Sequence, residues 1–261
     1  MNSFLTLEHV GHEFRHAKPC RYRALDNISF SVRKGEIVCL IGNSGCGKST
    51  LIQFIAGFLA PSEGVLIWNG RELDGPGPER TLVFDEGTLL PWLTCFQNVY
   101  LGVEHLFGKH DTKGQLRART LKALTRVGLH KFSDNLPREL SAGMRQRVCI
   151  ARAIATEPQV LLMDDPFNAL DPLTRAHLQE TVLRIVQSTG TTLLMVTHDV
   201  DEAVLMADRV VMLTNGPACT IGKIHALDLP RPRSGLALRH DPRYLAERAN
   251  ILRFLHDQRI K

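Results

Sequence analysis

The stretch Gly42-Asn-Ser-Gly-Cys-Gly-Lys-Ser-Thr50 decides the fold, because it completes the pattern G-x-x-x-x-G-K-S/T. The apolar run before it, residues 36–41, is typical of a buried strand, and residues 49–60 after it have helical spacing. Strand, glycine-rich turn and helix are the setting in which this pattern binds phosphate. The sequence therefore predicts a site for a nucleoside triphosphate.

We expect this loop to act mainly through its backbone, because glycines let successive N–H groups point inward at an anion. A helix that starts near Lys48 adds the positive end of its dipole. Lys48 is expected to reach the β- and γ-phosphates, and the Ser49 hydroxyl to ligate Mg²⁺. Cys46 is expected to be accessible to alkylation, although its side chain is not needed for the chemistry. The predicted nucleotide-binding residues are Gly42, Asn43, Ser44, Gly45, Cys46, Gly47, Lys48, Ser49 and Thr50.

The composition fits one large or two closely joined globular units, with 261 residues of which 44% are hydrophobic and 23% charged. No apolar stretch reaches the roughly 18 residues needed to cross a bilayer. The N-terminus lacks the pattern of a signal peptide, so a cytosolic location is expected. The six cysteines form no C-x-x-C pair, and we interpret them as free thiols of a reducing compartment.

Basic residues gather toward the C-terminus. Residues 222–261 hold nine Lys or Arg against four acidic residues, and this surplus of five equals the formal net charge of +5 of the whole chain. Such a tail suits anionic lipid, nucleic acid or an acidic partner, and an ordinary solvated surface explains it equally well.

Apolar runs and turn signals predict the order of the elements. Strand-like runs precede and follow the phosphate loop, and a helix-rich insertion is expected from about residue 93 to 140. Beyond it, short buried strands alternate with helices, which predicts an α/β fold with a mainly parallel core sheet. The expected strands are 4–12, 24–33, 65–68, 160–163, 192–196 and 209–213, and the expected later helices are 172–189, 201–206 and 242–257.

Three further motifs follow the phosphate loop: Leu140-Ser-Ala-Gly-Met-Arg-Gln-Arg147, Val160-Leu-Leu-Met-Asp-Asp-Pro-Phe167 and Thr197-His-Asp199. Together the four motifs resemble the ATP-binding subunit of ABC transporters over nearly the whole chain. The resemblance implies an ABC-type P-loop NTPase fold with a mainly parallel core sheet, an N-terminal antiparallel β subdomain and a helical subdomain at about 93–145. It implies an ATP-binding domain over 1–235 and a C-terminal helical tail over 236–261.

The same resemblance assigns roles to single residues. Asp164, with Ser49 and Asp85, is expected to hold Mg²⁺, and His198 to sense the γ-phosphate. Phe14 is the expected partner of the adenine ring, with Tyr22 as the alternative. The expected catalytic set is Asp165, His198 and Asp85. Residues 168–171 match the loop that crosses the dimer seam. The signature that is expected to touch ATP on the opposite subunit is Ser141, Ala142, Gly143 and Met144.

Finer resemblance narrows the family. Leu89-Leu-Pro-Trp-Leu-Thr94 is similar to importers of nitrate, cyanate, bicarbonate, taurine and other sulfonates, and residues 214–233 are most like the nitrate, cyanate and bicarbonate branch. This implies a membrane permease that docks near Leu90, Pro91 and Trp92, a solute-binding protein, the cytoplasmic membrane face and no nucleic acid. Core packing is the alternative for Trp92. The transported anion is not determined by this chain.

Three departures from the family pattern fall at chemically important positions: Asp85 replaces Gln, Asp165 replaces Glu, and Ala142 replaces Gly. The shorter Asp165 carboxylate is set back, and a misplacement of about 1 Å can slow a reaction on the order of 10²-fold. Ala142 adds strain if its position requires positive φ. We therefore expect slow hydrolysis, with a catalytically weak partner in a heterodimer as the alternative to a functional homodimer.

Three other functions fit parts of the sequence. DNA-maintenance ATPases of the ABC type carry a long coiled coil between the motifs, and no such heptad run exists here. The Leu140-Ser-Ala-Gly143 motif argues against a small-molecule kinase. A nucleotide-binding regulatory module without hydrolysis remains compatible with Asp85 and Asp165.

Overall fold

The computed structural model describes residues 4–15, 21–84, 88–168, 170–231, 233 and 241–260. The chain divides into two compact units. The first unit comprises Met1–Pro76 and Thr192–Lys261, and the second comprises Gly77–Thr191. The predicted domain boundary at residue 235 stays a prediction.

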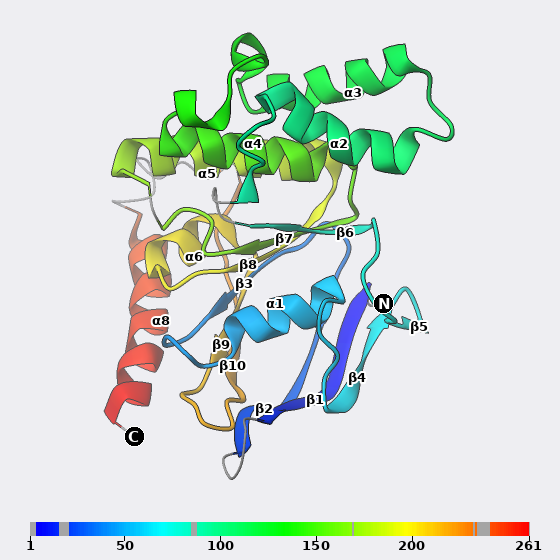
Figure 1. Cartoon of the computed structure of the whole chain (residues 1–261). Coiled ribbons are helices and arrows are strands. Elements are labelled where there is room, and N and C mark those ends of the chain that lie inside the picture. The colour runs from blue at the N-terminus through cyan, green and yellow to red at the C-terminus, as the bar shows by residue number, and fades with distance from the viewer. Residues whose placement is uncertain are drawn as a thin grey trace. The chain divides into compact units, whose positions relative to one another are not determined.

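The core of the first unit is a mainly parallel sheet (Figure 1). β3 (Ile37–Ile41) lies between β8 (Thr192–Val196) and β9 (Arg209–Leu213) and runs parallel to both. Every residue of β3 and β8 is buried, as expected for strands covered on both faces. β10 (Ile221–Ala226) pairs antiparallel with β9 at the edge. α1 (Lys48–Ala56) and α6 (Val200–Met206) pack against these strands.

A second sheet of this unit is antiparallel, in the order β2-β1-β4-β5. It confirms the predicted N-terminal β subdomain. β1 (Leu5–Arg15) and β2 (Arg21–Val32) run several residues further into the polar stretch than the sequence predicts, while β4 (Glu63–Trp68) and β5 (Arg71–Glu72) complete the sheet. Gly64 is required beside β1, because a Cβ there would lie 2.3 Å from the His9 carbonyl oxygen.

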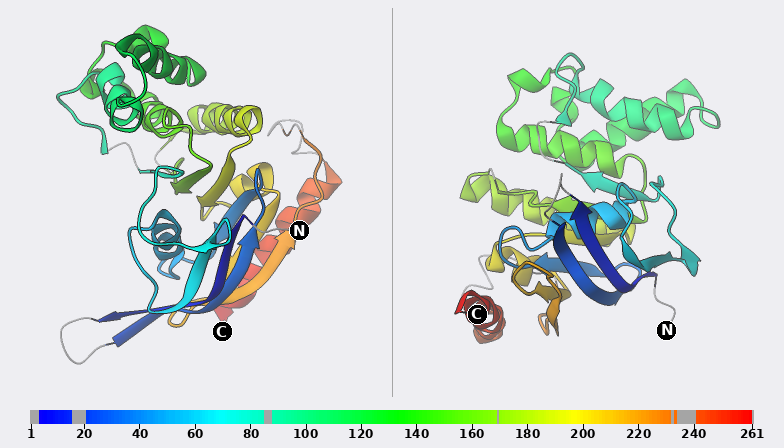
Figure 2. Two further views of the ribbon diagram at one scale, coloured as in Figure 1. Left: turned by 90° about the vertical axis from the view of Figure 1, so that its right-hand side faces the viewer. Right: turned by 60° about the horizontal axis from the view of Figure 1, so that its bottom comes forward.

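The second unit contains the predicted helix-rich insertion (Figures 1 and 2). Cap residues define where its helices begin: Thr94 and Thr112 each form a capping box with the Gln three residues later. β6 (Arg80–Val83) and β7 (Val160–Asp164) form a parallel pair. The helices are α2 (Cys95–Phe107), α3 (Lys113–Arg126), α4 (Ala142–Ile154) and α5 (Pro172–Thr189), with short 3₁₀ turns at His130–Phe132 and Pro137–Glu139.

The last helix, α8 (Pro242–Ile260), packs on α6 within the first unit. Tyr244 Oη donates a hydrogen bond to Asp201 Oδ1 at 2.6 Å, and Arg248 Nε donates to the same oxygen at 2.7 Å. α8 also contacts β10 through His225 and Glu247. In the described part of the chain, no helix combines the length and the apolar character required to cross a membrane.

Candidate functional site

The phosphate loop has the strand–loop–helix setting that the sequence predicts. β3 ends at Ile41 and α1 begins at Lys48, after Gly47 has turned the chain with a φ of +91°. A Cβ on Gly47 would lie 2.6 Å from Leu25 Cδ2, and one on Gly42 would lie 2.8 Å from Cys46 Sγ. Among the described residues no side chain caps the start of α1. The first N–H groups of the helix therefore form a cradle suited to an anion.

Lys48 is held inside this cradle. The residue is 7% exposed, and its Nζ donates hydrogen bonds to the carbonyl oxygens of Gly42 and Asn43, both at 2.9 Å. Ser49 lies exposed in the first turn of α1. The loop thus combines one fixed ammonium group, a hydroxyl and the uncapped N–H groups at the start of α1, a set that suits a polyphosphate.

Cys46 is buried, which corrects the expectation that its thiol is accessible. Only 1% of the residue is exposed, and its Sγ lies 3.8 Å from Lys48 Nζ. A hydrogen bond from the Cys219 thiol, with the positive charge of Lys48 as a smaller cause, lowers the pKa of Cys46 to about 6. The same bond raises the pKa of Cys219, because that thiol then keeps its proton.

His198 lies beside the phosphate loop, and its role as the sensor of the γ-phosphate stays a prediction. It is exposed and follows β8 after the buried Thr197. A pocket of about 470 Å³ brings it together with the first turn of the loop. Part of the pocket wall comes from α8, a helix that the sequence predicted without its place of packing. The lining residues are Gly42, Asn43, Ser44, His198, Val200, Leu252, Leu255 and His256.

The two candidate aromatic residues face each other across the β1–β2 hairpin, where Phe14 pairs with Tyr22. The ring of Phe14 meets His12 edge-on, with centroids 4.5 Å apart. Tyr22 is 38% exposed, and its Oη donates a hydrogen bond of 3.5 Å to the Gly45 carbonyl oxygen. Tyr22 therefore touches the phosphate loop directly.

The signature motif begins a helix of the second unit. Ser141 is the N-cap of α4, and its Oγ accepts a hydrogen bond from the Met144 N–H at 3.3 Å. Gly143 is required, since a Cβ there would lie 2.3 Å from Thr174 Cγ2. Ala142 belongs to the helix and is not among the described residues with positive φ. The backbone strain considered for Ala142 is therefore not present.

Asp164 ends β7, and Asp165 follows it with a φ of +44°. Aspartate tolerates this left-handed conformation better than most residues with a side chain. Asp171, in the predicted seam loop, caps α5 by accepting a hydrogen bond from the Thr174 N–H at 3.0 Å. Bonds from Thr174 lower the pKa of Asp171. The predicted Asp85 lies outside the described residues.

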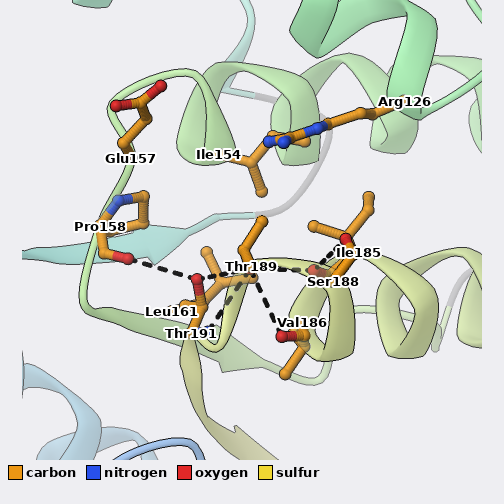
Figure 3. Close-up of a pocket in the computed structure, with 10 residues that line it drawn as sticks. All are labelled: Arg126, Ile154, Glu157, Pro158, Leu161, Ile185, Val186, Ser188, Thr189 and Thr191. Atoms are coloured by element: carbon orange, nitrogen blue, oxygen red, sulfur yellow. Dashed lines mark hydrogen bonds between the residues drawn. The ribbon is translucent and has the colours of Figure 1, made fainter.

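A separate pocket of about 270 Å³ lies within the second unit, between the ends of α3, α4 and α5 (Figure 3). Its hydroxyl groups donate to backbone carbonyls: Thr189 Oγ1 to Ile185 at 2.9 Å and Thr191 Oγ1 to Pro158 at 3.4 Å. Arg126 extends over Ile154 at one side (Figure 3). None of the site residues that the sequence predicts lines this pocket.

A phosphate loop that joins a parallel strand to a helix defines the chain as a P-loop nucleotide-binding protein. The family model described as ABC transporter matches residues 25–168, and the chain therefore belongs to the ABC transporter family. It binds ATP and is an ATPase coupled to transport. The predicted fold class is confirmed.

Relatives match the chain from end to end. The nitrate transport protein NasD of Klebsiella oxytoca is 50% identical and covers 100% of this chain and 99% of its own length. The bicarbonate transport ATP-binding protein CmpD of Synechococcus elongatus is 43% identical over 98% of this chain and 91% of its own length. The nitrate import ATP-binding protein NrtC of the same species is 48% identical, but the chain spans only 39% of NrtC.

A solved structure shares the fold. The dimeric ATP-binding cassette MJ0796, bound to ADP and Pi, superposes with a TM-score of 0.76 at 28% identity. The match covers 87% of this chain and 100% of the other.

Proposed function

We propose that this chain is the ATP-binding subunit of an importer that takes up a small anion, with nitrate or nitrite as the first candidate and cyanate, bicarbonate or a sulfonate as the others. The observation that carries the proposal is the identity of 50% to NasD over both full lengths. The intact phosphate loop, with Lys48 held inside it, supports the energy-providing role. The loop alone does not determine how fast ATP is hydrolysed, and the turnover number measures that rate.

The residues of the loop fit ATP. Bound phosphate oxygens replace the two carbonyl acceptors of Lys48 Nζ, and the N–H groups at the start of α1 bind the same phosphates. Ser49, Asp164 and Asp85 would hold Mg²⁺, because hydroxyl and carboxylate oxygens are the ligands it prefers. The ion supplies charge neutralisation at the phosphates. Phe14 supplies the adenine platform, and Tyr22, already bonded to Gly45, is the alternative.

Hydrolysis is proposed to be slow. Asp165 orients the attacking water with a carboxylate one methylene shorter than the usual Glu, and His198 binds the γ-phosphate beside the loop. We expect Asp165→Glu to raise the turnover number by about tenfold or more, measured as phosphate release. A native chain that is already fast and little changed by Asp165→Glu would show that the site is not weak.

The permease is proposed to dock on a short loop, residues 90–94, called the docking loop. Trp92 is 70% exposed, which argues against core packing and supports a role at an interface. The buried Asn98 side chain holds the loop: Oδ1 accepts from the Leu90 N–H at 2.9 Å, and Nδ2 donates to the carbonyls of Leu90, Leu93 and Thr94. A rigid loop with an exposed Trp is suited to anchor a partner helix.

The remaining partners complete the transporter. Two cassettes pair head to tail, so that Ser141, Ala142, Gly143 and Met144 of one subunit approach ATP on the other. The dimeric state of MJ0796 supports pairing. The second cassette is another copy of this chain or a related ATP-binding chain. The complex sits on the cytoplasmic face of the membrane and receives its anion from a solute-binding protein.

Anion uptake in cells that carry or lack the gene tests the function. We expect loss of uptake of nitrate on deletion, and rescue by the native chain and by Lys34→Ala, a change at an exposed lysine outside the site. Lys48→Ala should fail to rescue, because the loop loses its ammonium group. Unchanged nitrate uptake combined with loss of bicarbonate or sulfonate uptake would reassign the substrate, and unchanged uptake of all these anions would reject the function.

A further inference from the structure

A chain of two amide contacts joins the phosphate loop to the last helix. Asn43 Nδ2 in the loop donates to Asn215 Oδ1 at 2.5 Å. Asn215 Nδ2 donates in turn to the backbone carbonyl of Gln258 near the end of α8. Asn215 follows β9 and is separated from Asn43 by 172 positions in the sequence. One side chain thus connects two segments that are distant along the chain.

α8 is firmly attached at the opposite end of this connection. Tyr244 and Arg248 both donate to Asp201, in the first turn of α6. Glu247 bonds to His225 of β10, and Ile251 is fully buried. Figures 1 and 2 show α8 running beside α6 and β10. Because α8 is attached at several points, a displacement of its last turns also moves the elements that it packs against.

The close approach of α8 to β10 is built into the sequence. Gly222 leaves room for the ring of Phe254, because a Cβ at Gly222 would lie 2.4 Å from Phe254 Cζ. This contact orients the helix so that Leu252, Leu255 and His256 face the pocket beside the phosphate loop. The helix therefore forms a wall of that pocket and is not a loose tail.

The pocket adjoins the first residues of the phosphate loop. Lys48 Nζ donates to the carbonyls of Gly42 and Asn43, and these two residues line the pocket with His198. The two carbonyl contacts of Lys48 therefore hold the segment that contains Asn43. The Asn43 side chain is the link from that segment to Asn215.

We propose that Asn215 is a positioning residue for ATP binding, which holds the first turn of the phosphate loop and couples it to α8. This inference rests on the proposed binding of ATP by residues 42–50. Occupancy of the loop changes the Asn43–Asn215 contact, and the last turns of α8 change their protection with it. α8 then acts as part of the nucleotide site.

Two substitutions at Asn215 separate the two contacts. Asn215→Ala removes both, and we expect ATP to bind about five- to tenfold more weakly, since each neutral hydrogen bond contributes modestly. Asn215→Asp keeps an acceptor for Asn43 but cannot donate to the Gln258 carbonyl. Its negative charge beside the phosphate loop also opposes the anionic nucleotide. Its Kd is therefore not diagnostic, and at saturating ATP we expect this variant to lose the response of α8. Asn250→Ala, on the same helix but outside the pocket lining, is the matched control.

The measurements are the Kd of a fluorescent ATP analogue and amide hydrogen exchange of residues 251–260 with and without ATP. We expect ATP to alter exchange there in the native chain and in Asn250→Ala, and in neither Asn215 variant. Native-like Kd and native-like exchange in Asn215→Ala would overturn the proposal, as would a native chain that binds ATP without any change in α8. If Asn215→Ala does not fold, Asn215→Asp decides by its exchange. A native chain that binds no ATP would instead reject the proposed function.

Discussion

Cys46 and Lys48 share the interior of the phosphate loop, where the positive charge of Lys48 acts on the thiol. The thiolate of Cys46 is favoured by the hydrogen bond from Cys219 and by the ammonium group of Lys48, and this lowers the pKa to about 6 although burial opposes it. The Cys46 Sγ lies 3.8 Å from Nζ of Lys48, so the two side chains are close enough for this attraction to act. Low exposure protects this nucleophile from bulky reagents.

The Cys219 thiol is the first cause of the shift, so its removal gives a clear prediction. In Cys219→Ala the pKa of Cys46 should rise from about 6 toward the ordinary value of a thiol, 9.0. The thiolate fraction at pH 7 then falls, because a raised pKa favours the protonated form. The pH dependence of the ultraviolet absorbance of thiolate measures this, with Cys46→Ser to identify the contribution of Cys46. The same midpoint in the native chain and in Cys219→Ala would contradict the hydrogen bond.

The sequence pattern predicts the residues of the phosphate loop, because their roles depend on residues only a few positions away in the sequence. Gly42 and Gly47 belong to one loop, Lys48 begins the helix after it, and the pattern that contains them is local. The contacts of Asn215 and of Tyr22 depend on the folding of distant segments onto the loop. No periodicity or turn signal in the sequence carries that information, and both contacts became evident only from the structure.

At the scale of elements, local signals predict where most helices begin and end. Asp171 and Gly190 bound α5, and the expected helix agrees with it. α1 ends at Ala56, four residues earlier than expected, because Gly57 adopts a φ of +80° and a Cβ there would lie 2.1 Å from the Gly75 carbonyl oxygen. β10 was not predicted, since an edge strand that is largely exposed lacks a buried apolar run.

Substitutions of Asn98 and Trp92 in and beside the docking loop are expected to act on different quantities, the first on stability and the second on stimulation by the permease. Asn98→Ala leaves the buried polar groups of residues 90–94 without their partner, and we expect the free energy of unfolding to fall by about 2–4 kcal/mol. Trp92→Ala removes a side chain that is mostly in solvent and should change stability by less than about 0.5 kcal/mol. It should nevertheless abolish stimulation of the ATPase by the permease. Chemical denaturation and ATPase assays with reconstituted permease measure both effects.

If Trp92→Ala strongly lowers the free energy of unfolding, the ring packs in the folded chain. Permease stimulation that survives Trp92→Ala would place the docking surface elsewhere. The exposed Leu101 of α2, 52% exposed, is the next residue to substitute in that case.

At the scale of the whole molecule, the motifs divide between the two units of the chain. The phosphate loop and His198 belong to the first unit, while Ser141 and Asp164 belong to the second. The order of the motifs along the sequence was sufficient to predict the family, which the match over residues 25–168 confirms. The motifs do not predict which chain forms the second cassette, because that pairing depends on a surface that another chain completes.

Complementation between two inactive variants tests which chain is that second cassette. In a head-to-tail homodimer each site takes Lys48 from one copy and Ser141 from the other. A dimer of Lys48→Ala with Ser141→Arg therefore has one site with both defects and one site with none. Random pairing of equal amounts leaves about a quarter of all sites intact, because half of the dimers are mixed and each has one good site. We expect about that fraction of native ATPase activity after the two inactive chains are mixed. If the mixture stays as inactive as either variant alone while each variant still binds a related ATP-binding chain, the transporter uses a heterodimer.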